Sequence, residues 1–195
     1  MNIFIDFEAT QFGSHIISLG AVNDKGNSFY SLINPGNKAR KKITKFIVDL
    51  TGITKEMCAA AKNTDQVLTE FFDWCFSFYE TDLHFFCYGN CDGQYIDKAR
   101  EKVTSLKSKF ILDYMKKELV DYSLNVKRIL ELDHEIKLVK IASYYQNKII
   151  TQKHNALDDA IMLKQVFDGT ESSNSNDAVA FKEYLEKLKT NTEEI

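Results

Sequence analysis

Apolar and polar residues along the chain form five short segments that have the character of buried strands. Each segment is rich in Ile, Phe, Val or Leu, and most of them end at turn-forming residues. The predicted strands cover residues 2–8, 15–22, 28–33, 84–88 and 118–121. Since residues 23–27 have the composition of a hairpin turn, we expect residues 1–33 to form an antiparallel meander.

Six further segments carry apolar residues at intervals of three and four positions, which predicts amphipathic helices. The predicted helices cover residues 65–80, 94–106, 123–132, 138–146, 156–167 and 178–189. Thr64 or Asp65 can cap the first of them. The polar residues 169–177 predict a flexible linker before the last helix.

Together these elements predict an α/β domain with a mixed five-stranded sheet and helices on both faces. The domain is expected to cover residues 1–168. Residues 169–195 then hold the linker and a C-terminal helix that packs on or beside the domain.

Composition is that of an ordinary globular protein. The 195 residues are 44% hydrophobic and 27% charged, and no apolar run approaches the roughly 20 residues that span a bilayer. The first residues read as a strand, without the basic region of a secretory signal. The four cysteines form no Cys-x-x-Cys pair, so we expect reduced thiols in a cytoplasmic protein that does not associate with membranes.

The formal net charge of −3 does not favour nucleic acid, but two local stretches are basic. Five cations lie within residues 38–45, with no acid among them. A second group, between residues 98 and 109, is interrupted only by Glu101. Either stretch is able to hold a phosphate backbone, and the alternative is a solvated loop and a solvated helix face.

Acidic residues occur where strands and helices begin or end. Asp6 and Glu8 are two positions apart on a predicted strand, so their carboxylates project from the same side. Two adjacent carboxylates repel each other unless a cation lies between them, and hard divalent cations such as Mg²⁺ prefer such ligands. Asp92 follows the fourth predicted strand, where its alternative role is to cap the next helix.

Near the end of the predicted domain, His154 and Asp159 flank the start of a helix. Asp158 is the nearest competitor of Asp159, but the two lie about 100° apart around a helix, so only one faces a given site squarely. By itself, His154 is equally consistent with an ordinary loop histidine. Four carboxylates and one imidazole in one pocket fit two divalent ions, a phosphodiester and an attacking water.

This set of motifs resembles the DEDDh family of 3′→5′ exonucleases, which have the ribonuclease H-like fold. The matching residues are Asp6, Glu8, Asp92, His154 and Asp159. The amino-acid sequence of residues 6–10, 16–22 and 50–54 is most similar to that of the branch that trims RNA 3′ ends. The resemblance covers residues 1–167. Gln11 stands where that branch usually has Cys, and residues 103–116 match nothing in it.

The resemblance implies a hydrolase with two Mg²⁺ or Mn²⁺ ions. Asp6 would bridge two ions about 4 Å apart, Glu8 and Asp159 would complete the ligands of the first, and Asp92 would hold the second. His154, with an ordinary pKa near ~6.5, would be the general base for the attacking water. The product would be a 5′-mononucleotide from the 3′ end of a single strand, with RNA preferred to DNA.

Substrate contacts are expected beside the first acidic motif and in the first basic stretch. Thr10, Gln11 and Phe12 follow the acidic strand directly, so they are expected to line the pocket of the terminal nucleotide. Phe12 is expected to stack on a base, and its alternative role is in the core. Lys41 and Lys42 are expected to hold phosphates.

Three alternatives stay open. A DNA proofreading or repair exonuclease shares the same motifs, and a non-cleaving binding protein shares the fold. A structural zinc site with His84, Cys87 and Cys91 lacks an evident fourth ligand. The sequence does not decide between a monomer, a homodimer and a larger complex.

Overall fold

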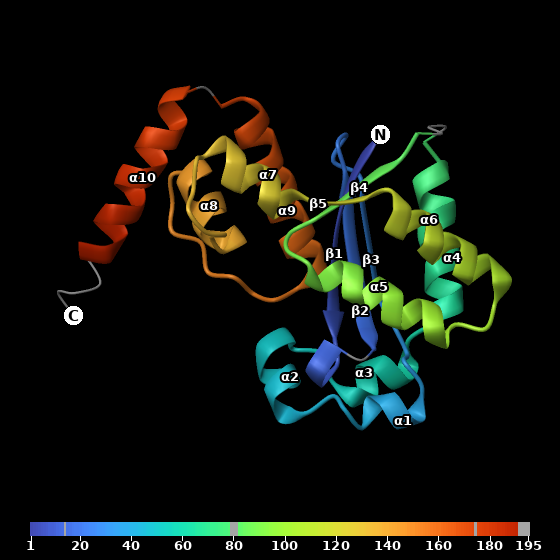
Figure 1. Ribbon diagram of the computed structural model, residues 1–195. Helices are drawn as coiled ribbons and strands as arrows, with labels where there is room; N and C mark the ends of the chain where they lie inside the picture. The colour runs from blue at the N-terminus through green and yellow to red at the C-terminus, as the bar shows by residue number, and fades with distance from the viewer. Residues whose placement is uncertain (14, 79–81, 174, 191–195) are drawn as a thin grey trace.

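A mixed five-stranded sheet forms the centre of the molecule (Figure 1). The computed structural model describes residues 1–13, 15–78, 82–173 and 175–190. The strands, in chain order, are β1 (Asn2–Ala9), β2 (Ile16–Asn23), β3 (Ser28–Leu32), β4 (His84–Cys87) and β5 (Leu119–Asp121). Their order in the sheet is β3-β2-β1-β4-β5. β1 pairs antiparallel with β2 and parallel with β4, so the mixed sheet is confirmed.

The first three strands form the predicted antiparallel meander. Between β2 and β3 the chain turns tightly, and the Asn27 amide donates to the Asn23 side-chain oxygen at 2.9 Å. Gly26 has a φ of 85°, which a residue without a Cβ adopts at little cost. The prediction of a hairpin turn at residues 23–27 is therefore confirmed.

Helices cover both faces of the sheet, as predicted (Figure 1). One layer contains α4 (Thr64–Phe76), α5 (Cys91–Lys102) and α6 (Leu106–Lys117). The other contains α7 (Tyr122–Ile129), α8 (Leu138–Tyr145) and α9 (Ala156–Glu171). In β1, Ile3, Ile5 and Phe7 pack in the cluster of the first layer, whereas Phe4 packs in the cluster of the second. The alternation of side chains along a strand thus supplies both cores.

The C-terminal helix α10 (Ser175–Thr190) lies outside α8 (Figure 1). Phe181 is fully buried there, with its ring centroid 5.0 Å from that of Tyr144. The predicted linker over residues 169–177 is wrong in part, because α9 continues through Glu171. Gly169 lies within α9, and a Cβ at this position would lie 2.6 Å from the Tyr145 ring. This glycine provides close packing between α8 and α9 rather than flexibility.

Four helices were not predicted. They are α1 (Asn37–Arg40), α2 (Lys45–Thr51), α3 (Lys55–Ala60) and α6. The first three are too short for a clear periodic pattern. The predicted helix 94–106 instead spans Cys91–Lys102, and the backbone is extended at Val103. The Ser105 side chain then caps α6 by accepting from the Ser108 amide at 3.4 Å. Residues 103–116 therefore form mainly a separate helix.

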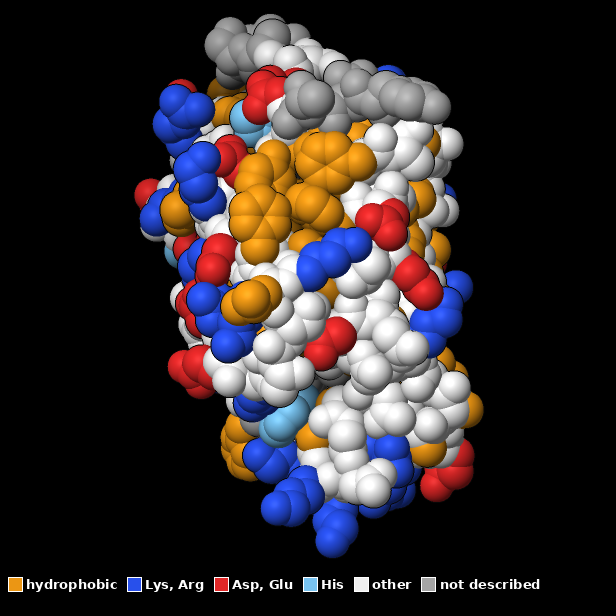
Figure 2. Space-filling model, turned by 90° about the vertical axis from the view of Figure 1, so that its right-hand side faces the viewer, with side chains coloured by type: hydrophobic (Ala, Val, Ile, Leu, Met, Phe, Trp, Pro, Cys, Tyr) orange, Lys and Arg blue, Asp and Glu red, His pale blue; other side chains and the backbone are white. Residues whose placement is uncertain are grey.

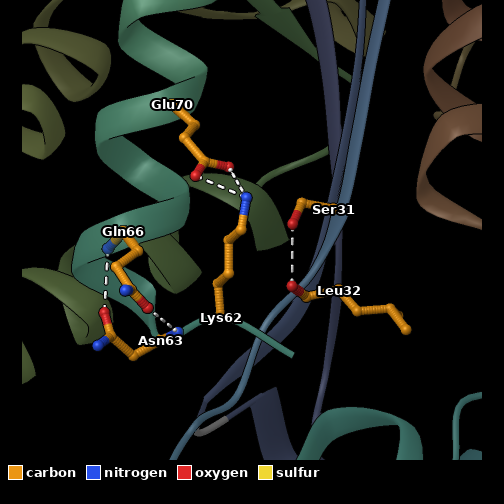
Figure 3. A network of polar contacts seen from close by, with 6 residues as sticks. All are labelled: Ser31, Leu32, Lys62, Asn63, Gln66 and Glu70. Atoms are coloured by element: carbon orange, nitrogen blue, oxygen red, sulfur yellow. Dashed lines mark hydrogen bonds and ion pairs between the residues drawn. The ribbon is translucent and has the colours of Figure 1, made fainter. Parts of the chain in front are cut away.

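The predicted helix 65–80 begins one residue earlier than expected and ends at Phe76, while residues 79–81 lie outside the described part of the chain. Its cap is Asn63 rather than Thr64 or Asp65. The Asn63 side chain accepts from the Gln66 amide at 3.0 Å, and the Gln66 side chain accepts from the Asn63 amide at 3.1 Å (Figure 3). This reciprocal capping box fixes where the chain enters α4.

The approach of α9 to the sheet depends on Gly20, the residue of β2 that pairs with Asp6 of β1. A Cβ at Gly20 would lie 2.2 Å from the Ala156 carbonyl carbon and 2.2 Å from the Leu157 nitrogen. Real Cβ atoms never come so close to backbone, so only glycine lets the first turn of α9 lie against β2. Consequently the N-terminus of α9 lies beside the acidic strand β1.

We expect Gly20→Ala to separate α9 from the sheet. The clash with backbone atoms should lower the free energy of unfolding by about 1–3 kcal/mol and should displace the first turn of α9. Because this turn carries Asp159, calorimetric Mn²⁺ affinity should fall together with stability.

Gly26→Ala is the matched control for this substitution. Unlike Gly20, Gly26 has a positive φ and has nothing within 4 Å of an added Cβ, so alanine there should cost about 1–2 kcal/mol of strain alone. Its Mn²⁺ affinity should equal that of the wild type. Equal Mn²⁺ affinities for the two variants would contradict the role of Gly20.

Candidate active site

Three acidic side chains meet where β1 and α5 adjoin. Asp6 and Glu8 project from the same side of β1, the side that faces α9. Asp92 is buried, and its Oδ1 accepts a hydrogen bond from the Phe7 amide at 3.2 Å. This bond ties the start of α5 to β1 between the two strand carboxylates.

Asp92 follows β4, as predicted, but its predicted alternative role as the cap of the next helix is wrong. β4 ends at Cys87, Asn90 is the cap residue, and Asp92 is the second residue of α5. The Gly89 backbone has a φ of 89° and turns the chain between strand and helix. This turn sends the Asp92 side chain back toward β1 rather than along the helix axis.

The first turn of α9 adds a further carboxylate. Asp159 is buried, whereas its neighbour Asp158 is exposed, as expected for two adjacent positions on a helix. The Asn155 side chain caps this helix by accepting from the Leu157 and Asp158 amides at 3.0 and 3.2 Å. Asp159 Oδ2 accepts from Gln152 Nε2 at 3.0 Å. The Asn155 cap and the Gln152 side-chain amide together orient the Asp159 carboxylate toward β1.

His154 comes just before this helix and has a φ of 49°, in the left-handed region that few residues other than glycine adopt. Its imidazole lies beside the acidic groups. Ligand atoms of Glu8, His154 and Asp159 all lie within 4.8 Å of one another. The structure thus brings the loop histidine and two of the predicted metal ligands into one cluster.

Burial and mutual repulsion oppose ionisation of these acids. Burial, followed by the charges of Asp92, Asp159 and Glu8, holds the pKa of Asp6 well above its usual range. Burial, Asp159 and Asp92 raise the pKa of Glu8 to about 8. Burial raises the pKa of Asp92 to about 7, against the lowering effect of its hydrogen bond from Phe7. Such shifts indicate acids that lie close together.

The same groups fit a divalent cation. Asp159 Oδ1 is buried and has no hydrogen-bond partner. A buried carboxylate oxygen without a partner is costly, and a bound cation would satisfy it. Carboxylate oxygens are also the ligands that Mg²⁺ and Mn²⁺ prefer. The donor set therefore suits hard divalent ions.

The residues predicted to line the nucleotide pocket lie in the turn after β1. Thr10 is buried, and its Oγ1 accepts from the His15 amide at 3.2 Å, which closes this turn. Gln11 is half-buried, and its backbone amide donates to the Lys42 carbonyl oxygen at 3.3 Å. Phe12 is 89% exposed and has a φ of 63°, so its predicted alternative role in the core is wrong.

The two basic stretches converge on this turn. Lys41 and Lys42 are exposed at the end of α1. Burial, Lys102 and then Lys42 lower the pKa of His15 to about 4, which places both lysines near that imidazole. Lys98 Nζ donates to the Phe12 carbonyl at 3.4 Å. Figure 2 shows Lys and Arg side chains gathered at the lower end of the molecule, where α1–α3 lie in Figure 1.

Sequence reasoning missed two residues that orient the cluster. Gln152, in the irregular segment before α9, holds Asp159, and no motif signals it. Asp121 ends β5, and its Oδ1 accepts from the Gly89 amide at 2.8 Å. An acid at the end of the strand next to β4 was a usable signal, because parallel strands end at the same edge of a sheet.

Comparison with known proteins agrees with this architecture. Residues 3–167 match the family model RNase_T, an exonuclease family. The nuclease domain of 3′hExo, a DEDDh family member bound to rAMP, is 19% identical, with a TM-score of 0.70 over 85% of this chain and 88% of that chain. Cell-death related nuclease 4 (CRN-4) is 18% identical, with a TM-score of 0.64 over 85% of this chain and 62% of that one. Exonuclease X in complex with 5′ overhanging duplex DNA is 17% identical, with a TM-score of 0.55 over 89% and 93%. No curated protein sequence matches the chain.

The sheet and its helices have the ribonuclease H-like fold. The chain belongs to the exonuclease family whose model it matches, and its activity is that of an exonuclease. Divalent metal ions are the usual cofactors of this family. No helix among the described residues has the length and apolar character needed to cross a membrane.

The raised pKa values predict how stability depends on pH. Glu8 and Asp92, with pKa values of about 8 and about 7, keep their protons in the folded protein at a pH where the unfolded chain has lost them. The folded state then binds more protons, so the free energy of unfolding of the metal-free protein should fall as pH rises from about 5 to about 8. Thermal unfolding in EDTA across this range measures the slope.

Glu8→Gln removes one of these titrating groups and should make the slope shallower. Saturating Mn²⁺ should flatten the slope, because metal binds the ionised carboxylates and the folded state then holds no more protons than the unfolded chain in this range. An identical slope for Glu8→Gln and wild type in EDTA would contradict the assignment of Glu8 as a raised-pKa group.

Proposed function

We propose that the protein removes 5′-mononucleotides from the 3′ end of single-stranded nucleic acid by a two-metal mechanism, and that RNA is preferred to DNA. The observation that carries this proposal is the buried convergence of carboxylates from β1, α5 and α9 beside one imidazole. A protein that uses this fold only to bind has no need of such a cluster.

Asp6, Glu8, Asp92 and Asp159 are the proposed ligands of two Mg²⁺ or Mn²⁺ ions. When bound, the ions stabilise the charge that develops on the attacking and leaving oxygens. The hydrogen bonds from Phe7 to Asp92 and from Gln152 to Asp159 hold two of the four carboxylates in place.

His154 is the proposed general base. Its imidazole lies with Glu8 and Asp159 at the edge of the cluster, and its half-buried position leaves a side open to a water molecule. A histidine takes a proton efficiently near neutral pH, because its ordinary pKa is close to that pH. The left-handed backbone of His154 fixes where the ring leaves the chain.

The substrate is proposed to lie over the turn after β1. The Phe12 ring is available to stack on a base, a contact worth about 1–3 kcal/mol. Gln11 and the buried Thr10 hold this turn in place through their bonds to Lys42 and His15. Lys41 and Lys42, with Lys98 on the opposite side of the turn, are proposed to contact phosphates of the strand.

The preference for RNA is supported by the similarity to the nuclease domain of 3′hExo, whose structure holds rAMP. DNA is the second candidate substrate, because exonuclease X was solved with duplex DNA and its chain is covered over 93% of its length. The four cysteines are free, which supports a reducing compartment such as the cytoplasm.

Matched RNA and DNA single strands, labelled at the 5′ end, test the activity. We expect stepwise shortening from the 3′ end with release of mononucleotides, faster on RNA, and its complete loss in EDTA. Asp6→Asn should abolish shortening. At a pH high enough to ionise the cluster, it should also raise the melting temperature of the metal-free protein, because one charge leaves a repelling cluster.

Asp158→Asn is the control for this variant, because the Asp158 carboxylate is exposed although it neighbours Asp159 in α9. It should keep the wild-type rate. Shortening by Asp6→Asn at near the wild-type rate would disprove the two-metal mechanism. Binding without any shortening by the wild type in Mn²⁺ would favour the non-cleaving alternative.

His154→Ala should lower the rate by about 10²–10⁴-fold and leave Mn²⁺ affinity nearly unchanged, because a general base moves a proton but does not hold the metal. Calorimetry of Mn²⁺ binding to His154→Ala and Asp159→Ala makes the comparison. His154 is close enough to Glu8 and Asp159 to be a ligand itself, so the result separates the two roles.

The control is His134→Ala, which alters an exposed histidine between α7 and α8 and should leave both rate and affinity unchanged. If His154→Ala loses Mn²⁺ as severely as Asp159→Ala, then His154 is a metal ligand and its role as general base is refuted.

A further inference from the structure

Two hydroxyl groups lie beside the acidic strand, on the face of the sheet that carries the acids. Ser18 of β2 is paired with Glu8 in the register of the sheet. Tyr30 of β3 is paired with Gly20, and Gly20 is paired with Asp6. Paired residues of antiparallel strands project from the same face. Ser18 and Tyr30 therefore project toward the face against which the first turn of α9 packs.

Ser18 is a buried polar side chain without a partner. The residue is 0% exposed, and its Oγ has no hydrogen-bond partner among the described residues. An unpaired hydroxyl in a protein interior costs free energy, so such groups are rare. The Cβ atoms of residues paired across antiparallel strands are about 4.5–5.5 Å apart. Since the Glu8 side chain is long enough to span this separation, its carboxylate is within reach of the Ser18 hydroxyl.

Tyr30 connects this hydroxyl to the N-terminus of α9. Burial raises the pKa of Tyr30, and the Ser18 side chain lowers it. The charge of Glu8 raises the same pKa, and the Asn155 side chain lowers it. The phenol hydroxyl therefore lies close to all three side chains. It has not formed a hydrogen bond with Ser18 Oγ, because that atom is without a partner.

The groups at the two ends of this row determine the direction of its hydrogen bonds. At one end, Asn155 Oδ1 already accepts from two backbone amides of α9, so the side-chain group left for Tyr30 is the Nδ2 amide, which only donates. At the other end, an ionised carboxylate only accepts. Each hydroxyl between them accepts from the side of Asn155 and donates toward the side of Glu8.

We propose that Ser18 and Tyr30, the hydroxyl pair, position the Glu8 carboxylate for a divalent cation. Asn155 donates to Tyr30, and Tyr30 donates to Ser18. Ser18 then donates to one oxygen of Glu8 and leaves the other oxygen to the cation. Because Asn155 caps α9, the hydroxyl pair also connects Glu8 to the helix that carries Asp159. The inference rests on the proposed role of Glu8 as a metal ligand.

Ser18→Ala separates a positioning role from a structural one. Calorimetric Mn²⁺ affinity should fall about five- to tenfold, because a hydrogen bond to a charged group is lost. The melting temperature in EDTA should not fall, because alanine removes a buried hydroxyl that has no partner in the metal-free protein. A hydroxyl that served only packing would give the opposite pair of results, a lower melting temperature and the wild-type affinity.

A double-mutant cycle tests the order of the two hydroxyls. Tyr30→Phe should lower Mn²⁺ affinity about threefold, because the Ser18 hydroxyl is then no longer directed toward the carboxylate. In the Ser18→Ala background the same substitution should leave the affinity unchanged, because Tyr30 acts through Ser18.

Tyr145→Phe is the matched control. It removes another tyrosine hydroxyl, whose oxygen lies 2.9 Å from Ser173 Oγ, and it should lower the melting temperature while Mn²⁺ affinity stays at the wild-type value.

Two results would overturn the hydroxyl pair alone. They are a wild-type Mn²⁺ affinity in Ser18→Ala, and an equal loss of affinity from Tyr30→Phe with and without the Ser18 hydroxyl. In both cases the wild type still binds Mn²⁺ and shortens RNA, so the proposed function stands. A wild type that binds no Mn²⁺ refutes the two-metal mechanism itself, and the hydroxyl pair with it.

Discussion

Repulsion between carboxylates is the constraint around which this structure is arranged. Four acids come from β1, α5 and α9, and they lie close enough that Asp92 and Asp159 raise the pKa values of Asp6 and Glu8. No such arrangement is stable by attraction among the acids themselves. The rest of the fold has to hold them together, and the apolar contacts on the two faces of β1 do so.

Each acid is fixed by a contact that does not involve another acid. The Phe7 amide anchors Asp92, so α5 cannot move away from β1 without losing a buried hydrogen bond. Gln152 and the cap residue Asn155 orient the first turn of α9, and Gly20 lets that turn reach the sheet. Hydrogen bonds from amides and close packing thus stabilise the site, while the carboxylates remain available for metal. This division is expected of a site whose charge is balanced only when ligand is bound.

Much of the site follows from regular geometry in the sequence. The two-residue period of a strand pairs Asp6 with Glu8, and the 100° step of a helix separates Asp159 from Asp158. What sequence did not reveal depends on contacts between distant segments. No local sequence pattern predicts the role of Gln152. Gly169 has the composition of a linker in the sequence, and only the structure shows that it packs against the Tyr145 ring. The start of α5 was misplaced by a few residues, so Asp92 lies inside the helix rather than at its cap, because element boundaries are the least determined part of a pattern.

The alternation of side chains along β1 also separates core packing from the acidic site. Even-numbered positions lead from Phe4 in one core to the acids Asp6 and Glu8, and odd-numbered positions from Ile3 to Phe7 fill the other core. The layer of α4 and α6 therefore packs against a side of the strand that carries no catalytic group. That layer still reaches the site through α5, which carries Asp92, whereas changes near the N-terminus of α9 reach the acids directly through Gly20.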